Sequence, residues 1–369
     1  MEPRVRVARV IFRQQESDLS DEFAIDAELG EALQPNEIEA AHKIAEVITA
    51  GVRQQFQKEG RPARRDAHPR AHGCVSAEFR VEDELPPELA QGAFVPGKAY
   101  PAWVRFSNGN ANIKRSDVKG DVRAMAIKLF DVPGEKILEG DKNAPTQDFI
   151  LLSSPVFFTN DPSSYLNLVE RATSTNLFVK ASALLAVGLK GSIIAIKMTM
   201  ARIANPFGIR YWSAVPYRLG DAPLKQAVKF SVIPHSSSER HPSSHSDPHF
   251  LRQAMIDQLQ TQDVIFDFLV QPRTSNGMSV EDSQTEWNEA QAPFHKVATI
   301  TIPKQVFATP ARDGLAESLA FNPWHSLPQH RPLGSTNRIR RVVYEAVSTL
   351  RRELNGVSTK EPTAWVDPA

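Results

Sequence analysis

The chain has 369 residues, with 43 lysines and arginines against 43 aspartates and glutamates. This balance leaves no global positive field to recruit nucleic acid, and the length can bury a large core in one or two domains. The single cysteine, Cys74, excludes an intramolecular disulfide and fits a reducing compartment. The first residues lack an uninterrupted apolar run, so we expect no secretory signal and a cytoplasmic location.

The first predicted element is a helix over residues 36–58, which follows a proline and spaces its apolar residues helically. A polar, proline-broken segment comes next, up to residue 73. We therefore expect residues 1–60 to form a leader and a helix. The main domain would then cover residues 61–355, with a C-terminal tail at 356–369.

Short apolar runs separated by turn residues predict strands in two groups. The first group is expected at residues 74–81, 99–107, 122–130 and 148–158. The second group is expected at residues 210–219, 227–233, 263–271 and 294–302. Two groups of four strands predict an α+β fold on a closed antiparallel eight-stranded β-barrel, whose seam is completed across the residues between the groups.

Helical sequence fills about residues 162–203, between the two groups of strands. Its most apolar part is interrupted by Lys180, Lys190 and Lys197, which argues against a membrane span. The simpler prediction is a pair of buried helices. Contact with a membrane surface stays open, because lysine stems can extend from an apolar helix.

A histidine-rich segment follows the sixth predicted strand. His241, His245 and His249 are four residues apart, a spacing that would bring zinc ligands together on a helix. Pro242, Pro248 and the serines around them favour a solvated loop over a metal site.

Residues 337–354 predict a C-terminal helix with two stripes. The core-facing stripe holds Ile339, Val342, Val343, Ala346 and Leu350. The stripe beside it holds Arg340, Tyr344, Val347 and Arg351. A solvated basic face would explain the second stripe if the helix stood alone, so the rest of the chain has to decide its role.

Three motifs occur in order along the chain and resemble those of the haem-containing catalase superfamily. They are R-x-x-H at 65–68, R-F-S at 105–107 and R-x-x-x-Y at 340–344. The resemblance covers about residues 60–355, and it includes "DVRAMAIKLF", the phenylalanine pair of "SSPVFFTND", and "FNP" before the last helix. It implies that the expected barrel is catalase-like, with inserted and C-terminal helices.

The resemblance implies a haem b cofactor whose iron is bound by Tyr344 as a phenolate, with Arg340 supplying the charge that favours this form. It also implies three arginines that pair with the haem propionates, for which the guanidinium geometry is suited. These arginines are Arg65, Arg105 and Arg351.

On the other face of the haem, the resemblance implies His68 as the acid–base residue and Ser107 as the group that holds its ring. It also implies that Tyr165 stacks over the haem. His72 is the alternative to His68, because a glycine follows it as in the family, but the spacing from Arg65 favours His68.

The implied function is that of a haem peroxidase or catalase-like oxidoreductase acting on hydrogen peroxide or on organic, including lipid, hydroperoxides. Leu152 stands where the family has an asparagine that orients peroxide, which favours peroxidase chemistry on larger substrates. The alternatives are an enzyme that converts fatty-acid hydroperoxides, as allene oxide synthases do, and a non-enzymatic haem-binding module. A homo-oligomer is left open.

Overall fold

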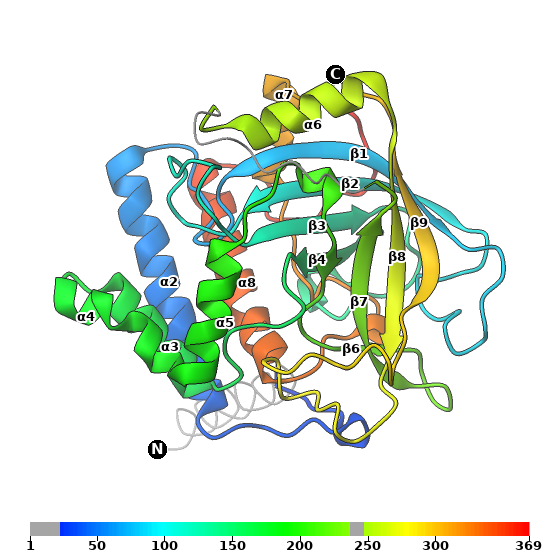
Figure 1. Ribbon diagram of the computed structural model, residues 1–369, viewed down its shortest axis with the longest axis horizontal. Coiled ribbons are helices and arrows are strands. Elements are labelled where there is room, and N and C mark those ends of the chain that lie inside the picture. Colours follow the sequence, from blue (N-terminus) through cyan, green and yellow to red (C-terminus); the bar gives the residue numbers. More distant parts are fainter. Residues whose placement is uncertain (1–22, 237–246, 369) are drawn as a thin grey trace, which may run out of the picture.

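The computed structural model describes residues 23–236 and 247–368, and its strands form one antiparallel sheet (Figure 1). The strands are β1 (Ala71–Val81), β2 (Ala99–Asn108), β3 (Arg123–Leu129), β4 (Gln147–Leu152), β5 (Tyr211–Trp212), β6 (Tyr217–Leu219), β7 (Gln226–Pro234), β8 (Val264–Pro272) and β9 (His295–Ile302). Because β5 pairs with both β4 and β7, eight strands close into a ring, and β6 adds to the edge of β7. The predicted closed antiparallel eight-stranded barrel is confirmed, with its seam at β4–β5 across the helical insertion.

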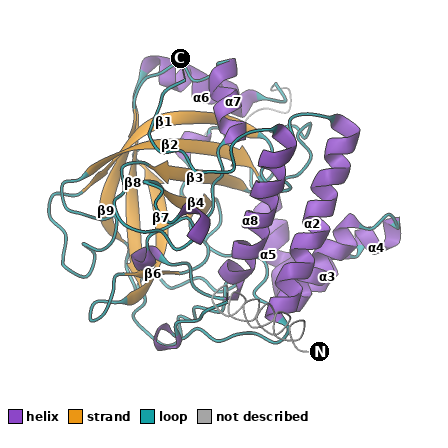
Figure 2. Ribbon diagram, turned by 180° about the vertical axis from the view of Figure 1, so that it is seen from behind, coloured by secondary structure: helices purple, strands orange, loops and turns teal. Residues whose placement is uncertain are grey.

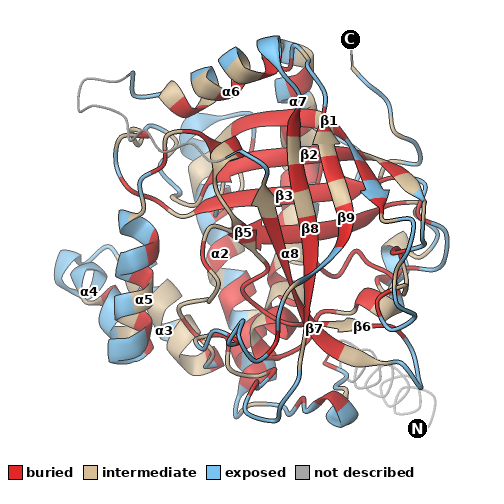
Figure 3. Cartoon of the chain, turned by 45° about the vertical axis from the view of Figure 1, so that its right-hand side comes forward, coloured by how far each residue is buried: buried red, intermediate tan, exposed pale blue. Residues whose placement is uncertain are grey.

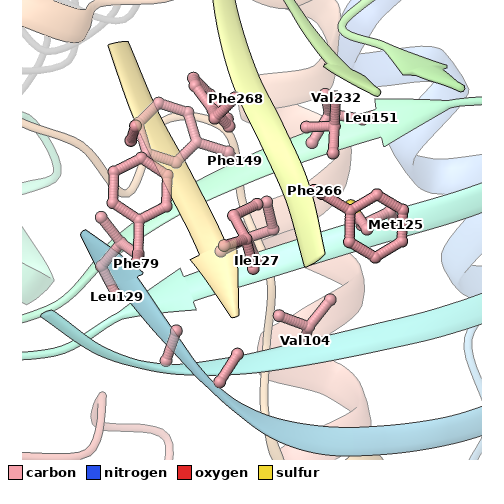
Figure 4. Packing of buried hydrophobic residues seen from close by; sticks show 14 of the residues in the cluster. Phe79, Val104, Met125, Ile127, Leu129, Phe149, Leu151, Val232, Phe266 and Phe268 are labelled. Atoms are coloured by element: carbon pink, nitrogen blue, oxygen red, sulfur yellow. The ribbon is translucent and has the colours of Figure 1, made fainter. Parts of the chain in front are cut away.

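Aromatic side chains fill the interior of the barrel, as Figure 4 shows for Phe79, Phe149 and Phe268 from β1, β4 and β8. The ring of Phe149 stacks on Phe79 at a centroid distance of 6.2 Å and meets the edge of Phe268 at 5.0 Å. Such pairs add to the free energy gained by burying apolar area. The barrel is therefore a packed core, and a ligand has to bind outside it.

Helices cover one side and one end of the barrel (Figures 1 and 2). They are α2 (Glu37–Glu59), α3 (Pro162–Thr173), α4 (Leu177–Ala181), α5 (Gly188–Met200), α6 (Phe250–Thr261), α7 (Pro310–Ser318) and α8 (Ser335–Asn355). A 3₁₀ turn, η3 (Ala183–Val187), links α4 to α5. The predicted helices at 36–58 and 337–354 correspond to α2 and α8, which pack on each other through apolar residues of a second core.

The start of α8 is anchored by Arg338, whose side chain is fully buried. Its guanidinium forms ion pairs with Glu31 at 2.6 Å, with Glu37 of α2 at 2.6 Å and with Glu281 at 3.1 Å. A buried guanidinium needs such partners, because desolvation otherwise makes its burial unfavourable. Two distant parts of the chain, residues 31–37 and the segment around Glu281, thus fix where α8 begins.

Two predicted strands differ from those in the structure, one because it is divided and the other because it is shorter. Residues 210–219 form two short strands, because the chain turns between them at Ala214, whose φ of 60° is unfavourable for a strand. The strand predicted at 148–158 ends at Leu152, shortly before Pro155, which cannot donate a ladder hydrogen bond.

The prediction that the insertion forms buried helices is wrong. The stretch Ala183–Met200 has a mean hydropathy of 1.6 and would be long and apolar enough to cross a membrane, yet only 28% of it is buried. Figure 3 shows α4 and much of α5 as exposed. The apolar composition had suggested burial, but these helices have only one side on the protein.

The last residues pack on the barrel. Glu361 pairs with the buried Lys128 at 2.5 Å, and the ring of Trp365 stacks on Trp103 at 5.4 Å. At the other end of the chain, residues 1–22 of the predicted leader lie outside the described residues, as do His241 and His245. Within the described residues there is no group of three side chains that could hold a metal ion.

Candidate active site

A cavity of about 310 Å³ is walled by α8, by the ends of β2, β3 and β4, and by the segment that precedes β1. Its volume falls in the range of small-molecule and cofactor pockets. Small residues such as Gly109, Ala124 and Ala126 leave room along its wall. All the site residues expected from the sequence lie in this wall: Arg65, His68, Arg105, Ser107, Tyr165, Arg340, Tyr344 and Arg351.

On the α8 side of the cavity, Arg340 and Tyr344 lie one turn apart and contact each other. Arg340 Nη2 donates a hydrogen bond to Tyr344 Oη at 3.3 Å, and the guanidinium lies 5.1 Å from the centre of the tyrosine ring. Burial by itself lowers the pKa of Arg340, but the oxygen of Tyr344 beside it raises that pKa above its usual value. Arg340 therefore stays a cation within hydrogen-bond distance of the tyrosine oxygen.

On the opposite side, His68 has a φ of 56°, a backbone region that residues other than glycine seldom adopt. Two contacts hold it there, since its carbonyl oxygen accepts from Arg105 Nη2 at 2.9 Å and its Nδ1 lies 3.3 Å from Ser107 Oγ. Burial, reinforced by the charge of Arg105, lowers the pKa of His68 to about 3. The imidazole is therefore neutral near pH 7 and able to accept a proton.

His72 points into a different environment and does not line the cavity. It is buried on β1, where its Nε2 lies 2.6 Å from Asn108 Oδ1 and its Nδ1 lies 4.0 Å from Asp117. Burial lowers the pKa of His72 to about 4. Of the two candidate histidines, the structure brings only His68 to the cavity.

Three arginines gather at one end of the cavity with little opposing charge. Arg65 and Arg351 share one carboxylate, that of Glu317, at 3.5 and 3.9 Å. Burial and the charge of Arg65 lower the pKa of Arg105 to about 9 and that of Arg351 to about 8. The Nε of Arg105 is buried without a hydrogen-bond partner among the described residues. This excess of buried positive charge suits a ligand with two carboxylates.

Sequence reasoning missed two acidic residues of this region, Asp66 and Glu317. Asp66 lines the cavity, and burial raises the pKa of its carboxyl. Glu317 lies on α7, about 250 residues from its partner Arg65. No sequence motif connects Glu317 with a residue so distant. Asp66 could have been found, because it directly follows Arg65 in the sequence.

The rest of the wall is largely apolar. The rings of Phe157 and Phe158 are tilted by 33° to each other with their centroids 4.3 Å apart, and Tyr165 of α3 makes edge contacts with both at centroid distances of 6.3 and 6.1 Å. Leu152 ends β4 in the same wall. A ligand in this cavity would lie between an aromatic and aliphatic surface and the arginine-rich end.

No family model matches the sequence. A relative by sequence is the "Catalase-related peroxidase" of Mycolicibacterium paratuberculosis (strain ATCC BAA-968 / K-10), which is 26% identical over 268 residues. The match covers 71% of this chain and 82% of the relative.

The fold is similar to that of solved catalases. The TM-scores are 0.59 for a fungal catalase, 0.61 for catalase A from Saccharomyces cerevisiae and 0.62 for a bacterial catalase, with identities of 17%, 19% and 15%. Each match covers 81% of this chain but only 61%, 63% and 59% of the catalase, so the chain spans about three fifths of their length. The fold is thus a catalase-type barrel. The similarity to a catalase-related peroxidase and the similarity in fold both support a relationship to catalase-like proteins.

Proposed function

We propose that the chain is a haem-dependent peroxidase that reduces hydrogen peroxide or organic hydroperoxides. One observation carries the proposal: a single cavity holds a tyrosine–arginine pair on α8 and a neutral histidine across from it. The catalase fold and the catalase-related peroxidase relative support it.

The residues of the cavity fit haem. Tyr344 offers an oxygen to the iron, held next to the charge of Arg340, and tyrosine is a known type of haem ligand. The three arginines at the other end would pair with the two propionates. When bound, haem would supply an iron centre at which the O–O bond of a peroxide can be broken.

His68 would move the proton in this reaction. Because Ser107 engages Nδ1, the other ring nitrogen is left to accept the proton of the incoming hydroperoxide. The same nitrogen would then return the proton to the leaving oxygen, so that water or an alcohol departs. The low pKa of His68 keeps the ring in the form that accepts a proton first.

The wall favours organic hydroperoxides over hydrogen peroxide alone. Leu152, Phe157 and Phe158 present carbon atoms to the cavity, and an apolar wall binds an apolar peroxide through burial of its surface. The same observation supports a second candidate, conversion of a fatty-acid hydroperoxide without an external electron donor.

The two candidates differ in whether they need a donor. The purified protein, loaded with haem, would be given hydrogen peroxide or cumene hydroperoxide, with and without an organic electron donor. The proposal expects donor oxidation with both peroxides. Loss of a lipid hydroperoxide without donor would favour the second candidate, and no consumption of any peroxide would contradict both.

A further inference from the structure

An apolar face is exposed on the outside of the helical insertion. Among the large apolar residues that are exposed in the described parts of the chain, nine lie between Leu177 and Met200. Phe178 is 89% exposed and Leu189 is 80% exposed. We call this surface the insertion face; it comprises Leu177, Phe178, Leu185, Leu189, Ile193, Ile196 and Met200. Side chains of this size rarely gather on a surface that only water covers.

Helix α5 has two apolar sides with different surroundings. One side is buried against the protein and contains Gly191, Ala195 and Met198. Gly191 packs so closely on the backbone oxygen of Phe158 that a Cβ there would lie 2.4 Å from it. The opposite side carries Leu189, Ile193, Ile196 and Met200 to the solvent. The inner side is enough to explain how α5 packs on the protein. The apolar residues of the outer stripe therefore need a different explanation.

The charged residues of α4 and α5 are all positive, although Asp282 from outside them lies 3.9 Å from Lys190. Lys180, Lys190 and Lys197 are exposed, and the sequence has no acidic residue between Glu170 and Asp221. Lys190 also donates to Thr285 Oγ1 at 2.8 Å, yet 57% of its side chain is exposed. On α5, Lys190 and Lys197 lie along one edge of the outer apolar stripe rather than within it. In a chain with zero formal net charge, this is a local concentration of positive charge.

We propose that the insertion face docks on the surface of a bilayer that contains anionic phospholipids. Its apolar residues would enter the boundary between head groups and acyl chains, while the lysines meet the phosphates. This inference does not depend on the proposed catalytic function.

Neither of two other arrangements fits this surface as well. A second copy of the chain, related by a two-fold axis, would bring like-charged lysines together. A membrane span would need one continuous helix of about 20 residues, whereas α5 has 13 and the residues before it, Ala183–Val187, form a separate 3₁₀ turn. The inner side of α5 is also held by the protein.

The test uses the full chain and vesicles of phosphatidylcholine, either pure or mixed with phosphatidylglycerol. We expect co-sedimentation with the mixed vesicles, weaker binding to the pure ones, and release by high salt. The double variant Lys180→Glu/Lys197→Glu should lose at least about tenfold in affinity for the mixed vesicles. The variant Leu189→Ser/Ile193→Ser should weaken binding to both kinds of vesicle.

Matched controls lie in the loop after β9, where Lys304 and Val306 are exposed, Val306 by 74%. Lys304→Glu and Val306→Ser should bind vesicles as the parent does. A folded parent that binds neither kind of vesicle would overturn the proposal. It would also be overturned if size-exclusion chromatography with light scattering showed a dimer that Leu189→Ser/Ile193→Ser converts to a monomer, since a second copy would then cover the face.

Discussion

His68 and His72 are only four residues apart, but they lie in different surroundings, His68 at the cavity and His72 beside Asn108. We predict that His68→Ala keeps haem binding and slows peroxide consumption by about a hundredfold or more, the usual effect of losing a positioned acid–base group. His72→Ala removes a buried hydrogen bond to Asn108 and should lower stability instead. Stopped-flow measurement of peroxide consumption, beside thermal unfolding of each variant, separates the two effects.

The reverse pattern would show that the wrong histidine was chosen. If His72→Ala abolished peroxide consumption while keeping the parent's unfolding temperature, His72 would be the residue that moves the proton. A His68→Ala variant with unchanged kinetics would then agree with that assignment.

Arg340 is expected to control how the protein holds haem in acid. Its guanidinium lies 3.3 Å from the oxygen of Tyr344, so its positive charge would stabilise the anionic form of the oxygen that we propose as the iron ligand. We predict that Arg340→Leu releases haem at a higher pH than the parent during acid titration followed by absorbance. Arg340→Lys keeps a cation and should lie between the two. Identical release curves for parent and Arg340→Leu would exclude this role.

Leu152 sets the polarity of the wall at the end of β4. We predict that Leu152→Asn raises the rate of oxygen evolution from hydrogen peroxide relative to donor oxidation with cumene hydroperoxide, because an amide can hydrogen-bond a small peroxide. Leu152→Ala enlarges the cavity without adding a polar group and serves as the control. Equal rate ratios in both variants would show that volume, not polarity, matters at this position.

At the scale of elements, α8 shows which features the sequence can predict. The core stripe and the stripe with Arg340 and Tyr344 follow from helical periodicity, and both occupy the expected sides of the helix. The role of Arg338 was not predictable, because its carboxylate partners lie up to 307 residues away. Periodicity describes one helix, whereas a buried ion pair depends on elements that only the fold brings together.

The anchoring of α8 by Arg338 leads to a stability prediction. Arg338→Leu would leave Glu37 buried without its cation and would leave Glu31 with only Arg331, so we expect the free energy of unfolding to fall by about 3–5 kcal/mol. The control is Arg80→Leu, which breaks an exposed pair with Asp83 and should cost less than about 1 kcal/mol. Urea unfolding measures both. Equal losses for the two variants would contradict an anchoring role.

The insertion shows the limit of reading hydrophobicity as burial. An apolar run predicts that a segment avoids water, but it does not tell whether the protein itself or another surface shields the segment. In the structure, α4 and α5 are exposed on one side. The lysines were the better signal, since Lys190 and Lys197 lie along an edge of the exposed stripe on α5, and a long lysine side chain can keep its charge in water beside an apolar surface.

At the scale of the whole molecule, barrel closure was predictable and the cavity was predictable only by resemblance. Alternating apolar runs specify strands, and their number suggested the closed ring. The residues of the cavity wall are scattered along the chain between Arg65 and Arg351, and no helical or strand periodicity connects such distant positions. Motifs resembling those of the catalase superfamily supplied that connection, but they missed Asp66, which fills a variable position of R-x-x-H, and Glu317, which lies outside every motif.

The central claim is that Tyr344 holds haem in this cavity, and the absorption spectrum of the reconstituted protein tests it most directly. We predict that the parent binds one haem per chain with a tyrosinate-type spectrum, and that Tyr344→Phe, which keeps the ring and loses only the oxygen, loses that spectrum and most of its haem affinity. A Tyr344→Phe variant with the parent's haem content and an unchanged spectrum would contradict the account.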